Sequence, residues 1–378
     1  MNEIPIGMLV SILGFGLGAV FGITVQRTNF CTMGAISDIV FMGSWNRFRA
    51  WALAVAVALL GSQALDVTET VDLGKSIYLS PNLGWVGAIV GGLLFGFGMT
   101  LSGGCANKTL VRLGTGSLKS LVVAIFLGLF AYMTLRGLIG LARVEFEALT
   151  ALDLAAAGLD SQAIPDLLAA AGLPTVAARL ATVAVLAGGL LWFCFRSPAF
   201  RASRRDLASG IIIGLLVPAA WFVTGYIGRD EFEPVALASF TFIGPTGDAI
   251  QYLMTFTGAT INFGIAAVGG VIAGAFVAAK LSREFRIETF TEAGDMVRHM
   301  TGGAIMGIGG VLALGCTIGQ GITGMSTLAL GSLIAILSIL AGGFFGMKYL
   351  EEDGFRGAFG ALLGRARRPT GAPYPPRL

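Results

Sequence analysis

Long apolar stretches, separated by short polar or charged segments, dominate the sequence. A helix that crosses a bilayer needs about 20 mostly apolar residues, and nine stretches of about that length are bounded by charged, proline or turn residues. They are 6–25, 48–65, 83–101, 118–140, 176–195, 208–228, 257–279, 298–315 and 327–347. The pattern predicts an all-α integral membrane protein with about nine transmembrane helices.

The first stretch has the length of a signal peptide but lacks its other features. Only Glu3 precedes it as a charged residue, so there is no basic n-region. Gln26 and Arg27 follow it where a small-residue cleavage site would be expected. We therefore expect residues 6–25 to be a retained span.

The composition excludes a soluble protein of two or three domains. Of the 378 residues, 55% are hydrophobic and 12% are charged, and the mean hydropathy is +0.81. An average soluble protein has roughly 25% charged residues, so this chain has too little charge to cover a water-facing surface. The net charge of +3 comes with no basic domain on which nucleic-acid recognition would depend.

The distribution of basic residues predicts how the chain is oriented. If the N-terminus lies outside, only five basic residues face outward, which leaves 20 of the 25 on the inner side. Cytoplasmic loops are enriched in Lys and Arg, so we expect the N-terminus outside and the C-terminus in the cytoplasm. The five outer residues are Lys75, Arg136, Arg143, Arg179 and Arg229.

Two segments differ from the spans. Residues 144–174 are only moderately apolar and include Asp153, Asp160, Pro165 and Asp166, which predicts an outer-side excursion with one or two short amphipathic helices. Residues 365–378 contain four prolines and a glycine and are predicted to be disordered.

Part of the sequence occurs twice. Six residues recur 211 positions later, and a weaker match at an offset of 210 aligns Phe30, Gly34 and Asp38 with Phe240, Gly244 and Asp248, placing Thr241 opposite Cys31. Each repeat together with the linker span crosses the membrane an odd number of times, so the second repeat has the opposite orientation to the first. This is the inverted-repeat architecture of many transporters. The alternative is that both halves are merely glycine-rich. The six residues are Gly91, Gly92, Gly96, Gly98, Gly104 and Cys105, repeated as Gly302, Gly303, Gly307, Gly309, Gly315 and Cys316.

This repeat predicts four regions in the chain. Residues 6–140 form the first repeat, and residues 208–347 form the second, each with four spans and two re-entrant loops. Between them, residues 141–207 contain the outer excursion, a linker span and a basic inner loop. Residues 348–378 form a cytoplasmic tail.

Four glycine-rich segments are too apolar for solvated loops and too irregular for full spans. They are 27–41 and 102–116 in the first half, and 240–253 and 315–326 in the second. Non-helical backbone is tolerated at membrane depth only where protein buries it or it lines a cavity. We expect re-entrant hairpins or broken helices that enter from both faces and leave an hourglass with a narrow waist.

Three of the four cysteines, Cys31, Cys105 and Cys316, lie in these breaks. With no C-x-x-C pair and only one histidine, a zinc site is not expected. Structural disulfides are not expected either, because the cysteines are assigned to hairpins from opposite faces, although the waist leaves room for proximity. Cys194, outside both repeats, is expected to be a small buried packing residue.

A cysteine thiol keeps its proton at neutral pH, so it donates a weak hydrogen bond to a soft acceptor without adding negative charge. That chemistry suits a sulfur-bearing anion, whose oxygens would bind free N–H groups at broken-helix N-termini. Lys108 and Arg112 either attract this anion or simply anchor the hairpin. Asp38 and Asp248 are expected to cap hairpin helices rather than to pair with basic neighbours. Close backbone approach is allowed at Gly103, Gly104, Gly319 and Gly321.

Three motifs resemble those of the YeeE/YedE sulfur-transport family. The motifs are Gln26-Arg27-x-x-Phe30-Cys31-x-x-Gly34-Ala35, Gly98-Met99-x-Leu101-x-Gly103-Gly104-Cys105, and Gly315-Cys316-Thr317-Ile318-Gly319-Gln320-Gly321. The similarity extends over nearly the whole membrane part. It is less clear over residues 144–174 and the C-terminal tail.

This resemblance implies a bacterial inner-membrane importer of thiosulfate or a close sulfur oxyanion. The ion would be relayed by transient S–H hydrogen bonds to Cys31, Cys105 and Cys316. The resemblance also implies a separate cytoplasmic TusA-like sulfurtransferase as partner, while relatives linked to selenium or other sulfur compounds leave the substrate open. Further pathway residues are expected at Gln26, Arg27, Gly34, Gly103, Gly104, Lys108, Thr241, Gly315, Thr317, Gly319, Gln320 and Gly321.

Two other functions remain open from the sequence. A membrane thiol sulfurtransferase would form a cysteine persulfide, and it would need an activated thiol with a resolving cysteine or base. A channel-like subunit for another anion would use the cysteines only for packing. The sequence contains no nucleotide-binding motif or hydrolytic constellation, so we expect a transporter with no catalytic residue, metal or cofactor.

Overall fold

The computed structural model describes residues 5–230, 235–352 and 354. Nine long helices form its bulk: α1 (Ile6–Thr28), α3 (Asn46–Val67), α4 (Trp85–Leu101), α6 (Leu118–Arg136), α9 (Thr175–Phe195), α11 (Arg204–Phe222), α13 (Phe263–Leu281), α14 (Ala293–Leu312) and α15 (Leu330–Glu351).

Shorter elements connect the long helices. The short α-helices are α2 (Thr32–Met42), α5 (Ala106–Gly114), α7 (Leu138–Thr150), α8 (Ile164–Ala170), α10 (Pro198–Ala202) and α12 (Ile243–Met254), and the π-helical turns are η4 (Val223–Ile227) and η6 (Gly319–Gly324). The 3₁₀ turns are η1 (Leu73–Lys75), η2 (Ile77–Leu79), η3 (Ala155–Ala157) and η5 (Phe256–Gly258). The strands are β1 (Asn82–Leu83) and β2 (Leu152–Asp153).

The prediction of an all-α membrane protein is confirmed. Among the described residues, eight helical segments are long and apolar enough to cross a membrane, with α1 and α2 forming one and α4 and α5 another. The predicted stretch 298–315 corresponds to α14, a helix of 20 residues. Its first turns contain Asp295, Arg298 and His299, and α14 is not among the eight segments.

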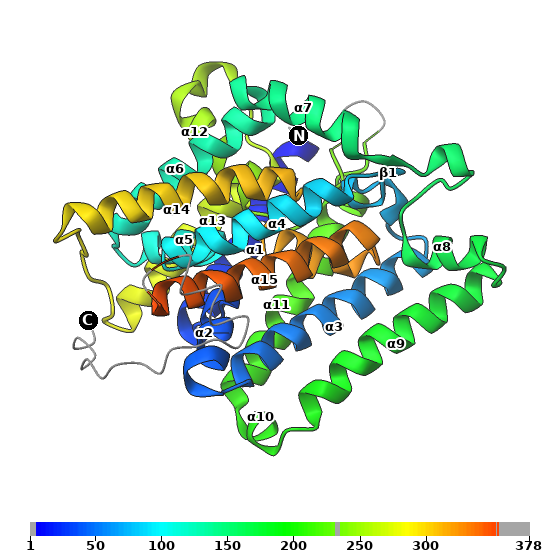
Figure 1. Cartoon of the computed structure of the whole chain (residues 1–378), viewed down its shortest axis with the longest axis horizontal. Coiled ribbons are helices and arrows are strands. Elements are labelled where there is room, and N and C mark those ends of the chain that lie inside the picture. Colours follow the sequence, from blue (N-terminus) through cyan, green and yellow to red (C-terminus); the bar gives the residue numbers. More distant parts are fainter. Residues whose placement is uncertain (1–4, 231–234, 353, 355–378) are drawn as a thin grey trace.

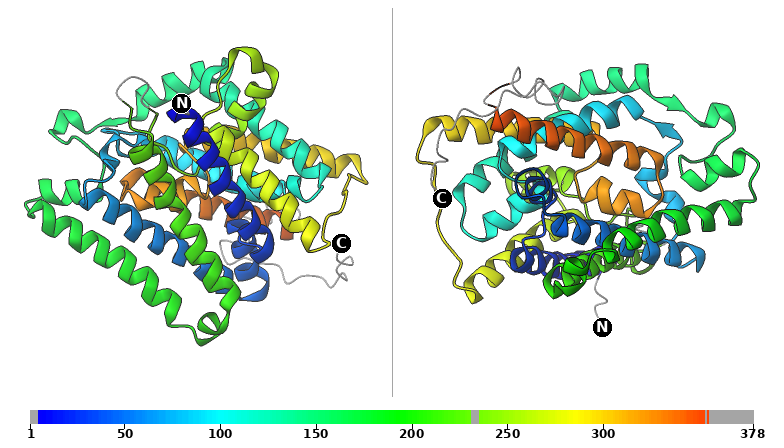
Figure 2. Two further views of the ribbon diagram at one scale, coloured as in Figure 1. Left: turned by 180° about the vertical axis from the view of Figure 1, so that it is seen from behind. Right: turned by 60° about the horizontal axis from the view of Figure 1, so that its bottom comes forward.

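Glycines allow the backbones of the long helices to approach closely. Gly18 and Gly22 of α1 face the carbonyl groups of Ala267 and Val271 in α13, and a Cβ at either glycine would overlap those oxygens. Figure 2 shows α1 in dark blue beside the yellow α13. Small residues at such crossings are typical of helix packing in membranes, so the G-x-x-x-G pair of Gly18 and Gly22 forms a packing surface.

The glycines that recur in the sequence meet one another in the structure. A Cβ on Gly91 would lie 2.6 Å from the Gly309 oxygen, and a Cβ on Gly98 would lie 2.8 Å from the Gly302 oxygen. These contacts join α4 to α14, with α15 along the other side of α4 (Figure 1). The repeated glycines therefore form the crossing at the centre of the bundle.

The two helices of this crossing have matching neighbours. Gly96 of α4 packs against the backbone of Ile339 in α15, while Gly307 of α14 packs against the backbone of Leu127 in α6. The contacted residues, like the two glycines, lie just over 210 positions apart in the sequence. Related halves would produce this reciprocal pattern, and inverted orientation of the halves stays a prediction.

Residues 144–174 form two short helices joined by extended chain, together with one feature that the sequence did not predict. Strand β2 pairs antiparallel with β1, so that Asp153 lies opposite Asn82. Gln162 holds this excursion to the bundle, because its Nε2 donates to Ser80 O (3.0 Å) and its Oε1 accepts from Gly331 N (3.1 Å). Strands of two residues have no recognisable periodicity, which is why the pattern did not reveal them.

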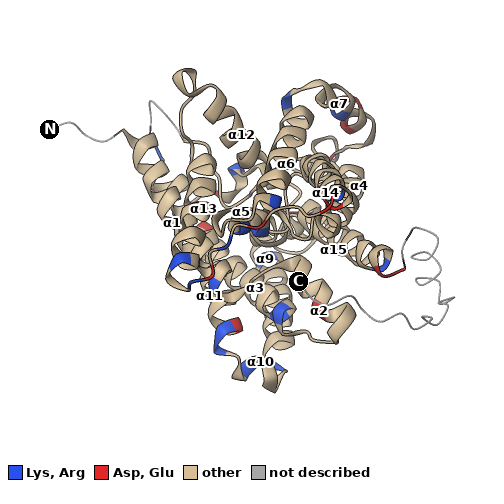
Figure 3. Ribbon diagram, turned by 90° about the vertical axis from the view of Figure 1, so that its left-hand side faces the viewer, with Lys and Arg blue, Asp and Glu red and all other residues tan. Residues whose placement is uncertain are grey.

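One end of the bundle, which we call the basic face, carries Arg27, Arg47, Lys119, Arg205 and Arg298. Figure 3 looks onto this end and shows Lys and Arg at the helix termini nearest the viewer. Lys119 Nζ and Arg298 Nη2 bind the two oxygens of Asp295, at 2.9 and 2.7 Å. The Lys119–Asp295 pair joins the N-terminal ends of α6 and α14, while the Arg298–Asp295 pair lies within α14. The predicted disorder of residues 365–378 lies outside the described residues.

Candidate functional site at the broken helices

The first break separates α1 from α2 at the basic face. Helix α1 ends at Asn29, which has a left-handed backbone with φ of 56°. Asparagine tolerates this conformation better than most residues with a side chain. The chain then extends through Cys31, the N-cap of α2, whose Sγ accepts a hydrogen bond from Gly34 N at 3.5 Å. The thiol is thereby placed at a helix N-terminus inside the bundle.

The second break has a similar arrangement between α4 and α5. Gly103 has φ of 69°, a conformation available to glycine without a steric penalty. Cys105 follows as the N-cap of α5. Residues 31 and 105 are thus both presented at the start of a short helix, as the prediction of broken helices requires.

The two breaks bring Cys31 and Cys105 together. Their sulfur atoms lie 3.8 Å apart, although the residues are 74 positions apart in the sequence. The Cys105 thiol also donates to Asn107 Oδ1 at 2.6 Å, and the Thr317 side chain lies close to it. Cys105 therefore joins Cys31 to the segment that carries the third motif.

Cys316 lies beyond α14, in the break that leads into η6. Its Sγ accepts a hydrogen bond from Gly319 N at 3.4 Å. A Cβ on Gly319 would lie 2.6 Å from Thr241 Oγ1 and 3.5 Å from Tyr78 Oη, so these hydroxyl groups adjoin the same turn. Among the described residues, no hydrogen bond links Cys316 to Cys31 or Cys105. The three thiols thus form a close pair and one separate group.

Sequence reasoning missed a match between two of the breaks. Cys31-Thr32-Met33-Gly34 and Cys316-Thr317-Ile318-Gly319 both have the pattern Cys-Thr-x-Gly. In each, the glycine N–H donates to the cysteine sulfur, and the buried threonine hydroxyl has no hydrogen-bond partner. The shared pattern was a signal available in the sequence, whereas Tyr78 became apparent only through its tertiary contact with the turn at Gly319.

The three motif cysteines are buried in this conformation. Cys105 and Cys316 expose none of their surface, and Cys31 exposes 6%. All four cysteines are free thiols. Among the described residues, no group of three or more His, Cys, Asp or Glu side chains could hold a metal ion. Passage of an ion would therefore require these segments to separate.

Basic side chains surround the thiol pair on the side of the basic face. Lys108 is buried, and its Nζ donates to Asn29 Oδ1 at 3.0 Å. Arg112 Nη1 donates to Gly103 O at 2.8 Å. Arg47 lies against Gly34. Lys108 thus binds the first break and Arg112 binds the second. Both side chains can anchor the breaks and attract an anion at the same time.

The capping roles expected for two aspartates are wrong. Asp38 lies in the second turn of α2 and pairs with Arg47 at 3.3 Å, while Cys31 is the N-cap of that helix. Asp248 lies within α12, whose N-cap is Phe242 and which has no side-chain cap. An aspartate caps only from the residue before the first turn, and both carboxylates lie too far along their helices.

Several predicted pathway residues have other contacts. Gln26 Nε2 donates to Glu284 Oε2 at 3.1 Å, and the Arg27 carbonyl accepts from Arg205, so both residues lie at the basic face away from the thiols. Gly315 N donates to Gly310 O at the end of α14, and the Gln320 side chain donates to Ala313 O. The contacts of Gly315 and Gln320 hold the backbone of the break after α14 in place.

The remaining predicted glycines also shape the breaks. Gly321 allows η6 to pack against Trp51 and Ile336, because a Cβ there would lie 2.7 Å from the Trp51 ring. Gly104 N donates to Met99 O at 3.0 Å, which closes the turn after α4.

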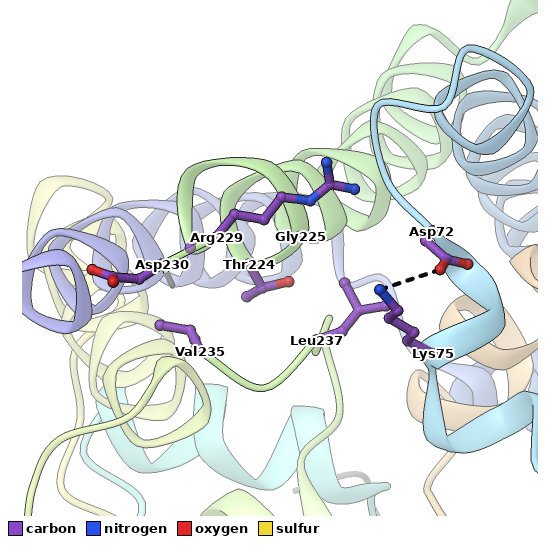
Figure 4. Close-up of a pocket in the computed structure, with 9 residues that line it drawn as sticks. Asp72, Lys75, Thr224, Gly225, Arg229, Asp230, Val235 and Leu237 are labelled. Carbon is purple, nitrogen blue, oxygen red and sulfur yellow. Dashed lines mark ion pairs between the residues drawn. The ribbon is translucent and has the colours of Figure 1, made fainter. Parts of the chain in front are cut away.

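A pocket of about 530 Å³ opens at the face opposite the basic face. Lys75, Thr224 and Arg229 line it, and Figure 4 shows the Arg229 side chain extending toward Asp72 and Lys75. Trp221, one helical turn before Thr224, packs edge-on against Tyr78. The pocket therefore adjoins the layer that contains Tyr78 and Thr241.

Cys194 lies away from the breaks, on α9. It is fully buried, and its Sγ donates to Arg49 O at 3.2 Å. The structure thus places it where helix α9 packs against α3, in agreement with the packing role expected for it.

Comparison with known proteins adds an independent finding. Over 342 residues the chain is 27% identical to the thiosulfate transporter TsuA of Escherichia coli (strain K12). This alignment covers 87% of the chain and 91% of the relative. It is 28% identical over 333 residues to the thiosulfate transporter TsuA of Spirochaeta thermophila, covering 87% and 96%. A probable transporter of E. coli, YedE, matches 30% of this chain at 32% identity. The sulphur transport family model matches residues 27–345, and the chain therefore belongs to the sulphur transport family.

Proposed function

We propose that this membrane transporter imports thiosulfate, or a closely related sulfur oxyanion, through the constriction formed by the broken helices. The observation that carries the proposal is the 3.8 Å approach of the Cys31 and Cys105 thiols at two helix N-termini. Similarity to two thiosulfate transporters over 87% of the chain supports this choice of substrate.

The thiols suit the terminal sulfur of thiosulfate. A protonated thiol donates a weak hydrogen bond to this soft, negatively charged acceptor and keeps the pathway free of added negative charge. Conduction requires binding that is strong enough for an ion to enter and weak enough for it to leave. Cys316, Cys105 and Cys31 would act in that order, from the side of Tyr78 to the side of Lys108.

The direction of transport follows from the proposed orientation. With the basic face in the cytoplasm, as the positive-inside rule favours, thiosulfate would enter past Lys75 and Arg229 and leave past Lys108. The membrane would be the bacterial inner membrane. The reciprocal packing of α4 and α14 supports two inverted repeats that rock about the constriction. A cytoplasmic TusA-like sulfurtransferase would accept sulfur at the basic face.

One observation favours a second candidate, a membrane sulfurtransferase. Cys105 lies close enough to Cys31 to act as a resolving thiol. Cys31 thiolate would attack the outer sulfur of thiosulfate, form a persulfide and release sulfite. Cys105 would then displace hydrosulfide and form a disulfide with Cys31. Each turnover would consume a dithiol reductant to restore both thiols, whereas transport by hydrogen bonding needs none.

Uptake of sulfur-labelled thiosulfate tests transport directly. In cells that lack their own importers, expression of the protein should confer saturable uptake. Cys31→Ala, Cys105→Ala and Cys316→Ala should each reduce it at least about tenfold, because loss of a hydrogen bond to a charged group costs about 1.5–3 kcal/mol. Cys194→Ala is the matched control and should retain uptake.

Three outcomes would contradict this proposal. Full uptake by all three variants would exclude a role for the thiols in transport. Loss of uptake in Cys194→Ala at normal expression would show that the pathway lies elsewhere. Mass spectrometry that finds a Cys31–Cys105 disulfide on purified wild-type protein after exposure to thiosulfate, or a Cys31 persulfide on Cys105→Ala, would favour the sulfurtransferase.

A further inference from the structure

Buried polar groups without partners recur beside the three motif cysteines. Among the described residues, seven buried side-chain nitrogen or oxygen atoms have no hydrogen-bond partner. Three of them lie one or two positions after a motif cysteine: Thr32 Oγ1, Asn107 Nδ2 and Thr317 Oγ1. All three side chains can donate a hydrogen bond.

These groups are deeply buried. The exposed fractions are 1% for Thr32, 1% for Asn107 and 0% for Thr317. A buried donor left without a partner costs about 1–3 kcal/mol. Three such donors lower the stability of the protein unless a ligand accepts their hydrogen bonds. Unpaired buried groups in native structures commonly mark a functional site.

The best-defined of these donors surround Cys105. Asn107 Oδ1 accepts from the Cys105 thiol at 2.6 Å, so Nδ2 of the same amide lies next to that sulfur. Thr317 approaches Cys105 from the other half of the chain. The Asn107 amide and the Thr317 hydroxyl therefore both adjoin the Cys105 sulfur.

We propose that Thr32, Asn107 and Thr317 bind the oxygen end of the transported anion while the neighbouring cysteines bind its sulfur end. This inference rests on the proposed function and extends it to the recognition of the substrate. Thiosulfate has a soft terminal sulfur at one end and three oxygens at the other. A thiol paired with a hydroxyl or amide donor matches both ends at once.

The pairing of a thiol with a hydroxyl or amide donor would select thiosulfate over sulfate and hydrosulfide. Sulfate lacks the terminal sulfur and leaves the thiols without a soft acceptor, while hydrosulfide lacks oxygens and leaves the hydroxyl and amide donors unpaired. A site built to hydrogen-bond a group discriminates strongly against a ligand that lacks the group. Because Thr32 and Thr317 share the Cys-Thr-x-Gly pattern, the same pairing of a thiol with a hydroxyl occurs at Cys31 and at Cys316.

The test measures KM for thiosulfate uptake together with the thermal unfolding of the purified protein. Thr317→Val replaces the hydroxyl by a methyl group of similar size and should raise KM about tenfold. Its unfolding temperature should not fall, because removing an unpaired buried polar group is neutral or stabilising. Thr317→Ser keeps the hydroxyl and should restore a KM near that of the wild type.

Asn107 supplies a second variant. Asn107→Asp keeps the oxygen that accepts from Cys105 but replaces the free donor by a group that repels an anion, so uptake should fall more than in Thr317→Val. Ser62→Ala is the matched control, because Ser62 Oγ is another buried group without a partner, on α3. That variant should leave KM unchanged.

The outcomes separate this inference from the proposed function. If the wild type shows no saturable thiosulfate uptake, both are overturned. If the wild type takes up thiosulfate and Thr317→Val and Asn107→Asp match it in KM, the donor role is overturned while transport stands. If Thr317→Val unfolds at a lower temperature and Thr317→Ser does not restore KM, Thr317 has a structural role and this inference is wrong.

Discussion

Cys105 lies at the meeting point of residues that are distant in the sequence. Its thiol contacts Cys31, 74 positions away, and Thr317 reaches it from the other half of the chain. Its hydrogen-bond acceptor Asn107 is local, two positions further along the chain. The motif spacing identified the cysteines, and the weak repeat correctly placed Thr241 at a break, beside Gly319. It did not reveal Asn107, because one buried amide in an apolar chain has no periodic signal.

Lys108 tests whether charge beside the thiols assists the anion. Lys108→Gln keeps a hydrogen-bond donor for Asn29 but removes a buried positive charge, so KM for thiosulfate should rise on the order of tenfold. Lys119→Gln is the matched control, because Lys119 pairs with Asp295 at the basic face. Equal effects of the two substitutions on KM would instead indicate that Lys108 only anchors the break.

At the scale of the elements, breaks in helices determine where chemistry occurs. Helix α1 stops at Asn29 and α4 stops before Gly103, and both residues have a positive φ. The apolar pattern predicted the spans near both breaks but not the pairing of α4 with α14. Glycines at the crossings select these partners, because only a helix without a Cβ there allows its neighbour's backbone to approach.

A glycine substitution in α1 tests this packing. Gly18→Ala would place a Cβ against the Ala267 carbonyl, so we expect the unfolding midpoint in detergent to fall by an amount equivalent to about 1–3 kcal/mol. Gly16→Ala lies in the same helix with no atom within 4 Å of the added Cβ, and should be neutral or slightly stabilising. Equal midpoints for the two variants would show that α1 does not depend on close contact with α13.

At the scale of the whole molecule, charge separates the two ends of the bundle. The basic face contains Arg27 in the last turn of α1, Arg205 at the start of α11 and Lys119 at the start of α6. The opposite face carries Asp72, Lys75 and Arg229 around its pocket. The thiol pair lies nearer the basic face, and Cys316 lies nearer the pocket. The proposed orientation therefore sets both the direction of import and the order of the thiols.

Labelling of introduced cysteines tests that orientation. Ala156→Cys is exposed on the excursion and Ala202→Cys is exposed on the basic loop, while the four native cysteines are buried. A membrane-impermeant maleimide applied to spheroplasts should label position 156, and should label position 202 only after lysis. The reverse pattern would invert the proposed topology and make the basic face periplasmic.

The sequence by itself determined that this is an all-α membrane protein of the sulphur transport family, and it identified the three cysteines. Those properties are local, since a span needs only about 20 consecutive apolar residues and a motif only a short run. Tertiary structure alone decided that Cys31 meets Cys105, that Thr317 joins them, and that Gln26 does not. Such contacts depend on how closely glycine-lined helices pack, which no single segment of the sequence specifies.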